Sequence, residues 1–262
     1  MDNFNLLKKA ESLFIAEEYH EAEKLYESSS NLIENRYAIH CYGMCLVNLG
    51  KYDKAIDVFC EITNKYPYYG KAWYSLGRTY LIKGNTQQAI ECFTNTKNIL
   101  HDDADVYFYS ALCYELLKNY DKAINDYKMS LNLNNGYQTH MNLGLCYYDL
   151  GNLDLALKHT REAFNLNPND LDTLRYYVYI LIKLNKKKEA YNVLLNSTLC
   201  YDGDATILEL LVLLALDNKN YDIADKTYIK LKKIENESSE PFDYSRFKKI
   251  AQNNLGDVFE VK

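Results

Sequence analysis

One alanine recurs at an almost constant interval along this chain, and that interval constrains the fold more than any other feature of the sequence. Successive copies are 33, 34, 34, 33, 34 and 34 residues apart, and they are Ala22, Ala55, Ala89, Ala123, Ala156, Ala190 and Ala224. A fixed period of roughly 20 to 50 residues is typical of repeat proteins, in which each repeat is one supersecondary unit. We therefore expect seven copies of one unit between residue 3 and about residue 238.

A second position, twelve residues before each alanine, carries a small or β-branched residue. Its occupants are Ala10, Gly43, Gly77, Ala111, Gly144, Val178 and Val212. Aromatic residues stand three positions before the alanine or four positions after it, and we expect them in the core: Tyr19, Tyr52, Tyr120 and Tyr221 before it, and Tyr26, Phe59, Phe93, Tyr127 and Tyr228 after it. A small residue lets two antiparallel helices approach closely while the aromatic rings fill the space beside the contact.

The helical period within a unit is clearest in the third copy. Trp73, Leu76, Gly77 and Tyr80 follow the i, i+3, i+4, i+7 spacing of a single helix face. The dipeptide at residues 84–85, Gly-Asn, then breaks the pattern, and a second helix follows it. Each unit is therefore predicted to be a pair of helices joined by a turn.

The stretch AWYSLGRTYLIKGNTQQAIECF, residues 72–93, carries Trp, Leu-Gly, Tyr, Ala and Phe in an order that resembles the tetratricopeptide repeat family. Residues 36–67 and 140–168 resemble the same repeat through their glycines and alanines and through their closing Pro67 and Pro168. The resemblance implies an all-α solenoid, a right-handed superhelix of helix pairs whose first helices line a concave groove. The predicted units are residues 3–35, 36–69, 70–103, 104–136, 137–170, 171–204 and 205–238. Residues 239–262 are expected to form a capping helix and tail, because a helix-start pattern at residues 239–241 precedes an apolar stripe.

Composition narrows the functional class. The formal net charge is −6, which disfavours a nucleic-acid-binding surface. No apolar run reaches the ~20 residues of a membrane helix, and the first residues lack the pattern of a signal peptide. The seven cysteines include no C-x-x-C pair, so we expect free, structural thiols in a reducing, cytoplasmic setting.

The sequence contains no motif that predicts catalysis. It has no phosphate-binding glycine loop, no G-x-S-x-G and no H-E-x-x-H. His40, Cys41 and Cys45 lie close together, but a second pair with metal-ligand spacing is missing. We therefore expect no enzyme activity, no cofactor and no metal.

In the first helix of each unit, the residues that face the groove are expected at fixed sequence offsets from the small residue. Tyr and Arg, which are enriched in binding hot spots, stand at many of these offsets in the third to sixth units. The candidate groove residues are Tyr74, Arg78, Phe108, Tyr109, Leu112, Asn142, Tyr148, Arg175, Tyr176 and Tyr179. The competing explanation is coding bias, because the chain contains 26 tyrosines and is rich in Asn, Lys and Ile.

One family function can be tested by its residues. Co-chaperones of this family clamp the C-terminal carboxylate of heat-shock chaperones with Lys, Asn and Arg at five positions. The corresponding residues here are Phe4, Lys8, Cys41, Lys71 and Ser75. Only Lys71 matches, and a carboxylate requires several charge-assisted donors together. We therefore do not expect this function.

The first helix of the seventh unit is apolar on nearly all sides, which predicts that it is buried all round. Its inner face carries Leu210, Leu213 and Leu216. We expect either the C-terminal tail or a second copy of the chain to cover this face, the latter giving a homodimer.

These observations predict a non-enzymatic scaffold or adaptor that holds a peptide or helix of a partner protein in a Tyr-rich groove. Two alternatives stay open. The first is an assembly or secretion chaperone that shields an apolar client segment, which the leucines of the seventh unit favour. The second is an RNA-binding helical repeat, which the negative net charge disfavours.

Overall fold

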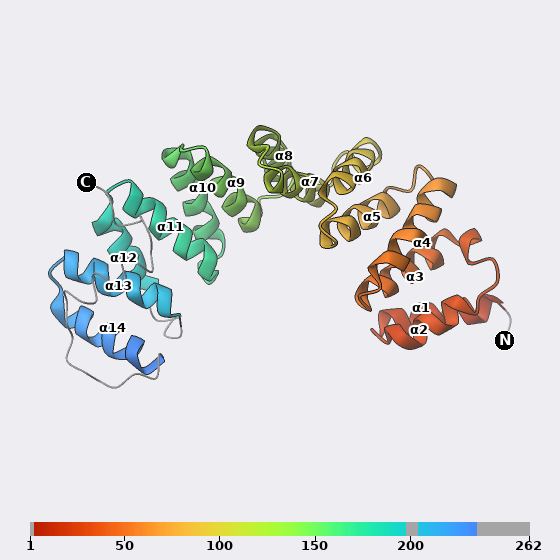
Figure 1. Ribbon diagram of the computed structural model, residues 1–262, viewed down its shortest axis with the longest axis horizontal. Coiled ribbons are helices and arrows are strands. Elements are labelled where there is room, and N and C mark those ends of the chain that lie inside the picture. Colours follow the sequence, from red (N-terminus) through yellow and green to blue (C-terminus); the bar gives the residue numbers. More distant parts are fainter. Residues whose placement is uncertain (1–2, 198–203, 235–262) are drawn as a thin grey trace. The chain divides into compact units, whose positions relative to one another are not determined.

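The computed structural model describes residues 3–197 and 204–234, and it places them in α-helices joined by short turns, with one 3-10 turn at Leu32–Glu34 (Figure 1). The fourteen α-helices of these ranges follow one another as helix pairs. The first helices of the pairs are α1 (Asn3–Ile15), α3 (Arg36–Asn48), α5 (Gly70–Ile82), α7 (Ala104–Leu116), α9 (Tyr137–Asp149), α11 (Leu171–Lys183) and α13 (Ala205–Asp217). The second helices are α2 (Tyr19–Glu27), α4 (Tyr52–Lys65), α6 (Thr86–Ile99), α8 (Tyr120–Leu133), α10 (Leu153–Leu166), α12 (Lys187–Ser197) and α14 (Tyr221–Ile234).

This order confirms the predicted all-α helical repeat fold. The predicted capping helix, residues 239–262, lies outside the described residues. The chain divides into two compact units, Met1–Asn135 with α1 to α8 and Gly136–Lys262 with α9 to α14.

Local sequence explains where several of the helices begin. Asn35, Asn119, Asn152, Asp170 and Asp204 each precede a helix, and each side chain accepts a hydrogen bond from a backbone N–H of the first turn. Such a cap satisfies one of the otherwise unpaired N–H groups at a helix start and contributes about 1 kcal/mol.

The recurring alanines form the contact between the two helices of each pair. All seven are completely buried: Ala22, Ala55, Ala89, Ala123, Ala156, Ala190 and Ala224. The two helices of a pair also approach closely at Gly144, where an added Cβ would lie 2.8 Å from Cγ2 of Thr160. The repeat therefore encodes helix packing, as its spacing predicts.

The aromatic landmarks follow the prediction only in part. Tyr26, Phe59, Phe93 and Tyr127, which stand four residues after the alanine, are fully buried. The prediction of a core position is wrong for Tyr221, which is 55% exposed. Tyr221 is the first residue of α14, so it lies beside the turn at the start of that helix.

Candidate partner-binding surface

In the first of the two compact units, Met1–Asn135, α5 and α7 bring four of the predicted groove residues into one cluster. The Tyr74 and Tyr109 rings meet edge to face with their centroids 5.9 Å apart, and the Phe108 ring lies 5.4 Å from that of Tyr109. The guanidinium of Arg78 lies 5.0 Å from the Tyr109 centroid and 5.7 Å from that of Tyr74. We call Tyr74, Arg78, Phe108 and Tyr109 the Arg78 cluster.

All four side chains of the Arg78 cluster are half-buried, so they combine a fixed position with an accessible surface. The cluster rests on the core, because Phe93 stacks on Tyr109 at 6.1 Å and Tyr127 lies 5.8 Å from Phe108. Leu112, one turn after Phe108 on α7, is also half-buried. The sequence predicted that these five residues face the groove from the third and fourth repeats, and in the structure all five are half-buried.

The Arg78 cluster contains a positive charge, and its ion pairing differs from that of Arg161. Within the described part of the chain, no carboxylate lies within ion-pair distance of its guanidinium, whereas Arg161 pairs with Glu189. Burial raises the pKa of the Tyr74 hydroxyl above its usual value, and the positive charge of Arg78 opposes this shift only partly. Tyr74 therefore keeps its proton, and the cluster offers a cation and a hydroxyl on an aromatic platform.

In the second unit, the predicted residues lie on α9 and α11. Asn142, Tyr148, Arg175 and Tyr179 are half-buried, and Tyr176 is 37% exposed. Burial raises the pKa of the Tyr179 hydroxyl above its usual value, and the nearby charge of Arg175 opposes this shift only partly. Tyr179 therefore keeps its proton while its side chain stays half-buried.

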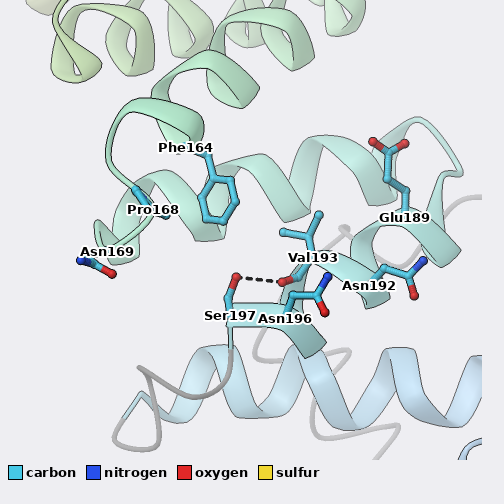
Figure 2. Close-up of a pocket in the computed structure, with 8 residues that line it drawn as sticks. All are labelled: Phe164, Pro168, Asn169, Glu189, Asn192, Val193, Asn196 and Ser197. Carbon is cyan, nitrogen blue, oxygen red and sulfur yellow. Dashed lines mark hydrogen bonds between the residues drawn. The ribbon is translucent and has the colours of Figure 1, made fainter.

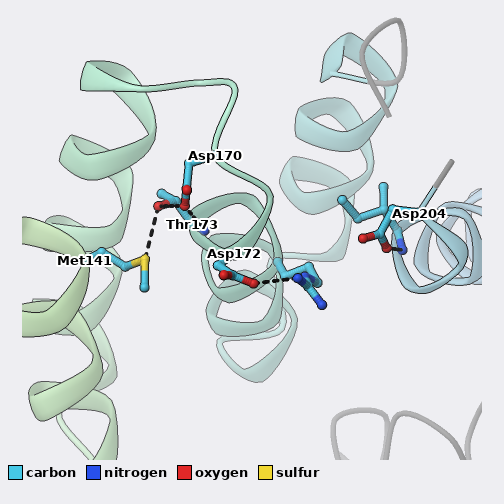
Figure 3. Close-up of polar contacts among 7 residues, drawn as sticks. Met141, Asp170, Asp172, Thr173 and Asp204 are labelled. Atoms are coloured by element: carbon cyan, nitrogen blue, oxygen red, sulfur yellow. Dashed lines mark hydrogen bonds and ion pairs between the residues drawn. The ribbon is translucent and has the colours of Figure 1, made fainter. Parts of the chain in front are cut away.

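Arg175 itself has a partner on its own helix. Its Nη2 lies 2.5 Å from Oδ1 of Asp172. In the same region, Thr173 Oγ1 lies 2.6 Å from Oδ1 of Asp170 and 3.2 Å from Sδ of Met141, so it joins α11 to α9 (Figure 3). The sequence placed both Arg78 and Arg175 among the candidate groove residues, but in the structure the guanidinium of Arg175 already has a carboxylate partner.

The leucines of α13 lie in the interior. Leu210 and Leu213 are buried within the one chain, and Leu216 is half-buried. A second copy is therefore not required to remove Leu210 and Leu213 from water. The tail proposed to cover them is outside the described residues, so its docking stays a prediction.

Two histidine contacts were not predicted from the sequence. His40 Nε2 lies 3.0 Å from Ser75 Oγ, and burial lowers the pKa of His40 to about 4. His140 on α9 and His159 on α10 lie with their Nδ1 atoms 3.0 Å apart. The two members of each pair are 35 and 19 residues apart, so no local motif could reveal them.

The thiols have the properties of packing residues. Cys41, Cys45, Cys92, Cys113 and Cys146 are buried and form no disulfide, whereas Cys200 is not among the described residues. Burial raises the pKa of Cys45, Cys92 and Cys113 to about 12, which keeps these thiols protonated and poorly nucleophilic. In residues 3–197 and 204–234, no group of three or more His, Cys, Asp or Glu side chains is arranged to hold a metal ion.

Sequence profiles of the tetratricopeptide repeat match four segments of the chain: residues 42–67, 70–95, 105–133 and 137–170. Each matched segment lies over a helix pair of the structure. The chain contains tetratricopeptide repeats. No curated protein matches its sequence.

Solved tetratricopeptide repeat structures share the fold at low identity. A repeat protein from Parabacteroides merdae ATCC 43184 is 14% identical with a TM-score of 0.66, covering 97% of this chain and 99% of its own. PilF of Pseudomonas aeruginosa is 18% identical with a TM-score of 0.65, covering 84% and 100%. MamA from Desulfovibrio magneticus RS-1 is 20% identical with a TM-score of 0.60, covering 65% and 98%. As a tetratricopeptide repeat protein, the chain is suited to protein–protein interaction. None of the helices in the described ranges combines the length and apolar character needed to span a membrane.

Proposed function

We propose that this chain is a non-enzymatic adaptor that binds a peptide or helix of a partner protein on the first-helix surface of its repeats. The Arg78 cluster is the proposed centre of binding, and Leu112 extends it along α7. In the second unit, Asn142, Tyr148, Arg175, Tyr176 and Tyr179 are proposed as further contacts.

The unpaired guanidinium of Arg78 carries the proposal. It lies beside two tyrosine rings in a half-buried position, and no carboxylate from the described part of the chain pairs with it. A partner carboxylate could form a charge-assisted hydrogen bond there without first displacing an internal ion pair. Aromatic side chains and arginine are also the residues that contribute most to binding at protein interfaces. We therefore expect a partner segment with an acidic residue beside an apolar one.

The chaperone alternative has less support than the adaptor. It depended on an apolar face in the seventh unit, and Leu210 and Leu213 of that face are buried within the chain. A client would have to displace whatever covers these leucines before it could bind there.

The experiment that tests the proposal is site-specific photo-crosslinking in cells, followed by mass spectrometry. A photo-reactive amino acid replaces Leu112 in one variant and Asn125, an exposed residue of the second helix α8, in the matched control. We expect one partner to be captured from position 112 and not from position 125. Adding Arg78→Glu to the first variant should abolish this product while helicity stays unchanged.

Binding of the identified segment should also weaken as salt rises, because Arg78 is partly exposed and its attraction for a carboxylate is screened. Equal capture from both positions, or capture that Arg78→Glu leaves unchanged, would contradict the proposal. Capture of RNA in place of protein would favour the helical-repeat RNA-binding alternative.

A further inference from the structure

A pocket of about 440 Å³ lies in the second unit between α10, the turn that follows it and α12 (Figure 2). It involves second helices of the repeats, whereas the proposed adaptor surface is built from first helices. Its volume falls within the roughly 300–1,000 Å³ of typical ligand pockets. Its lining residues are Phe164, Pro168, Asn169, Glu189, Asn192, Val193, Asn196 and Ser197.

The apolar part of the pocket is fixed in position. The Phe164 side chain is half-buried, and its ring lies 5.6 Å from that of Tyr177. Val193 is half-buried on α12, and Pro168 closes the end beside the turn. An aliphatic or aromatic side chain of a ligand placed here would contact apolar groups of two helices and would be removed from water.

The polar part consists mainly of two amides on one flank of α12. Asn192 and Asn196 are exposed, and neither forms a hydrogen bond within the described part of the chain. A carboxamide presents one acceptor and two donors, so it can engage the N–H and the C=O of one peptide residue together. The Ser197 hydroxyl proton is not available to a ligand, because Ser197 Oγ donates to the backbone carbonyl of Val193 at 2.8 Å (Figure 2).

The spacing of the two amides matches an extended peptide. Residues four apart on an α-helix are separated by about 6 Å along the axis. Residues two apart in an extended chain are separated by about 6.6 Å and present their backbone groups to the same side. Asn192 and Asn196 can therefore meet alternate residues of one extended segment, whose side chains project toward Phe164 and Val193.

The charge at the other end of the pocket is already balanced. Glu189 accepts from Nη2 of Arg161 at 2.7 Å, and Arg161 Nε also donates to the hydroxyl of Tyr177 at 3.1 Å. A charged ligand would gain no unpaired partner from this ion pair. The lining thus favours an uncharged segment.

We propose that this pocket is a second binding site, which takes an uncharged extended segment of a partner protein with one aliphatic or aromatic side chain in the space between Phe164 and Val193. Asn192 and Asn196 bind the backbone of that segment. The site is independent of the Arg78 cluster, and its affinity is expected to be insensitive to salt.

The probe is the blocked peptide acetyl-Ser-Thr-Val-Phe-Val-Thr-Ser-amide, added to the full-length protein and followed by NMR. We expect saturable shifts of the side-chain amide signals of Asn192 and Asn196 and of the Val193 methyl signals. The variant Asn192→Ala/Asn196→Ala should bind at least ten-fold more weakly. The matched control is Asn125→Ala, because Asn125 follows Ala123 by two positions as Asn192 follows Ala190.

Two altered peptides complete the test. N-methylation of alternate backbone amides removes the N–H groups that the asparagines would bind, and replacement of the central Phe by Asp removes the apolar side chain, so both changes should abolish the shifts. The proposal is overturned if the original peptide produces no saturable shift or if the double variant binds it equally well. It is also overturned if the amides of Asn192 and Asn196 are already protected by another part of the chain. Arg78→Glu tests the adaptor surface separately, because it should not affect binding of this peptide.

Discussion

At the scale of single residues, His40 shows how the repeat surface combines burial with polarity. Its imidazole lies 5.8 Å from the ring of Phe59 and 5.6 Å from that of Tyr69, and it bonds Ser75 on the next first helix. Burial lowers its pKa to about 4, and the charge of Lys71 adds to this effect. His40 is therefore neutral in the folded protein throughout the physiological range.

This lowered pKa predicts a loss of stability in acid. The unfolded chain takes up a proton at His40 near pH 6.5, whereas the folded protein does so only near pH 4. Between these values the unfolded state binds more protons, so the free energy of unfolding falls as the pH falls. The difference between the two pKa values corresponds to a loss of at most roughly 3–4 kcal/mol.

Urea denaturation at several pH values between 7 and 4 measures this loss. His40→Gln cannot titrate but keeps a polar group near Ser75, so its stability should depend less on pH than that of the wild type. The pKa of His140 is also lowered by burial, but its contribution is common to both proteins and cancels in the comparison. Parallel pH curves would show that His40 does not carry the effect.

At the scale of the helix pair, the close contact at Gly144 predicts a specific packing energy. A Cβ there would lie 2.8 Å from Cγ2 of Thr160 and 3.3 Å from the backbone carbonyl oxygen of Ala156. Because one of these neighbours is backbone, α9 and α10 must separate to admit a methyl group. Gly144→Ala should therefore destabilise the fold by about 1–3 kcal/mol in thermal or urea unfolding.

The matched compensating change is Thr160→Ser, which removes Cγ2 and keeps the hydroxyl that donates to the Ala156 carbonyl at 2.9 Å. The double variant should recover part of the lost stability, with a coupling of at least about 0.5 kcal/mol. Strict additivity of the two substitutions would mean that Cγ2 is not the obstacle.

The helix pairs were predictable from the sequence because their contacts repeat. Each landmark alanine is buried for the same reason in every copy, so the same packing requirement appears in the sequence seven times, at a spacing of 33 or 34 residues. A contact that occurs only once produces no periodic pattern in the sequence. The Asp172–Arg175 ion pair depends on rotamers, and the pocket beside Val193 depends on how α12 packs against α10.

The candidate binding surface was partly predictable for a related reason. Helical periodicity placed Tyr74 and Arg78 on one face of α5, because three and four residue steps return to the same side of a helix. It could not show that Arg78 lies over Tyr109 of the next first helix, since that contact depends on the geometry between repeats. It also could not show which of Arg78 and Arg175 has a carboxylate partner.

At the scale of the whole molecule, the division at Asn135 predicts that the first unit folds on its own. Repeats are stabilised mainly by their immediate neighbours, so four complete helix pairs retain almost all of their packing when residues 136–262 are removed. Residues 1–135 should give a helical circular dichroism spectrum and a cooperative thermal transition. The fragment also keeps the whole Arg78 cluster and should still bind the partner segment of that cluster, but more weakly than the full chain because the proposed contacts of the second unit are missing.

The informative control is residues 1–116, which ends at α7 and lacks α8. Removing α8 takes away the hydrogen bond of Ser110 to Asp126 and the contact of Phe108 with Tyr127. We therefore expect α7 to unfold in this fragment, with a loss of helical ellipticity larger than the missing residues alone would cause. Its binding should also fall, because Tyr109 and Phe108 would no longer be held in place. If residues 1–135 were unfolded in isolation, the two compact units would depend on each other for stability, and the first unit could not serve as an independent binding module.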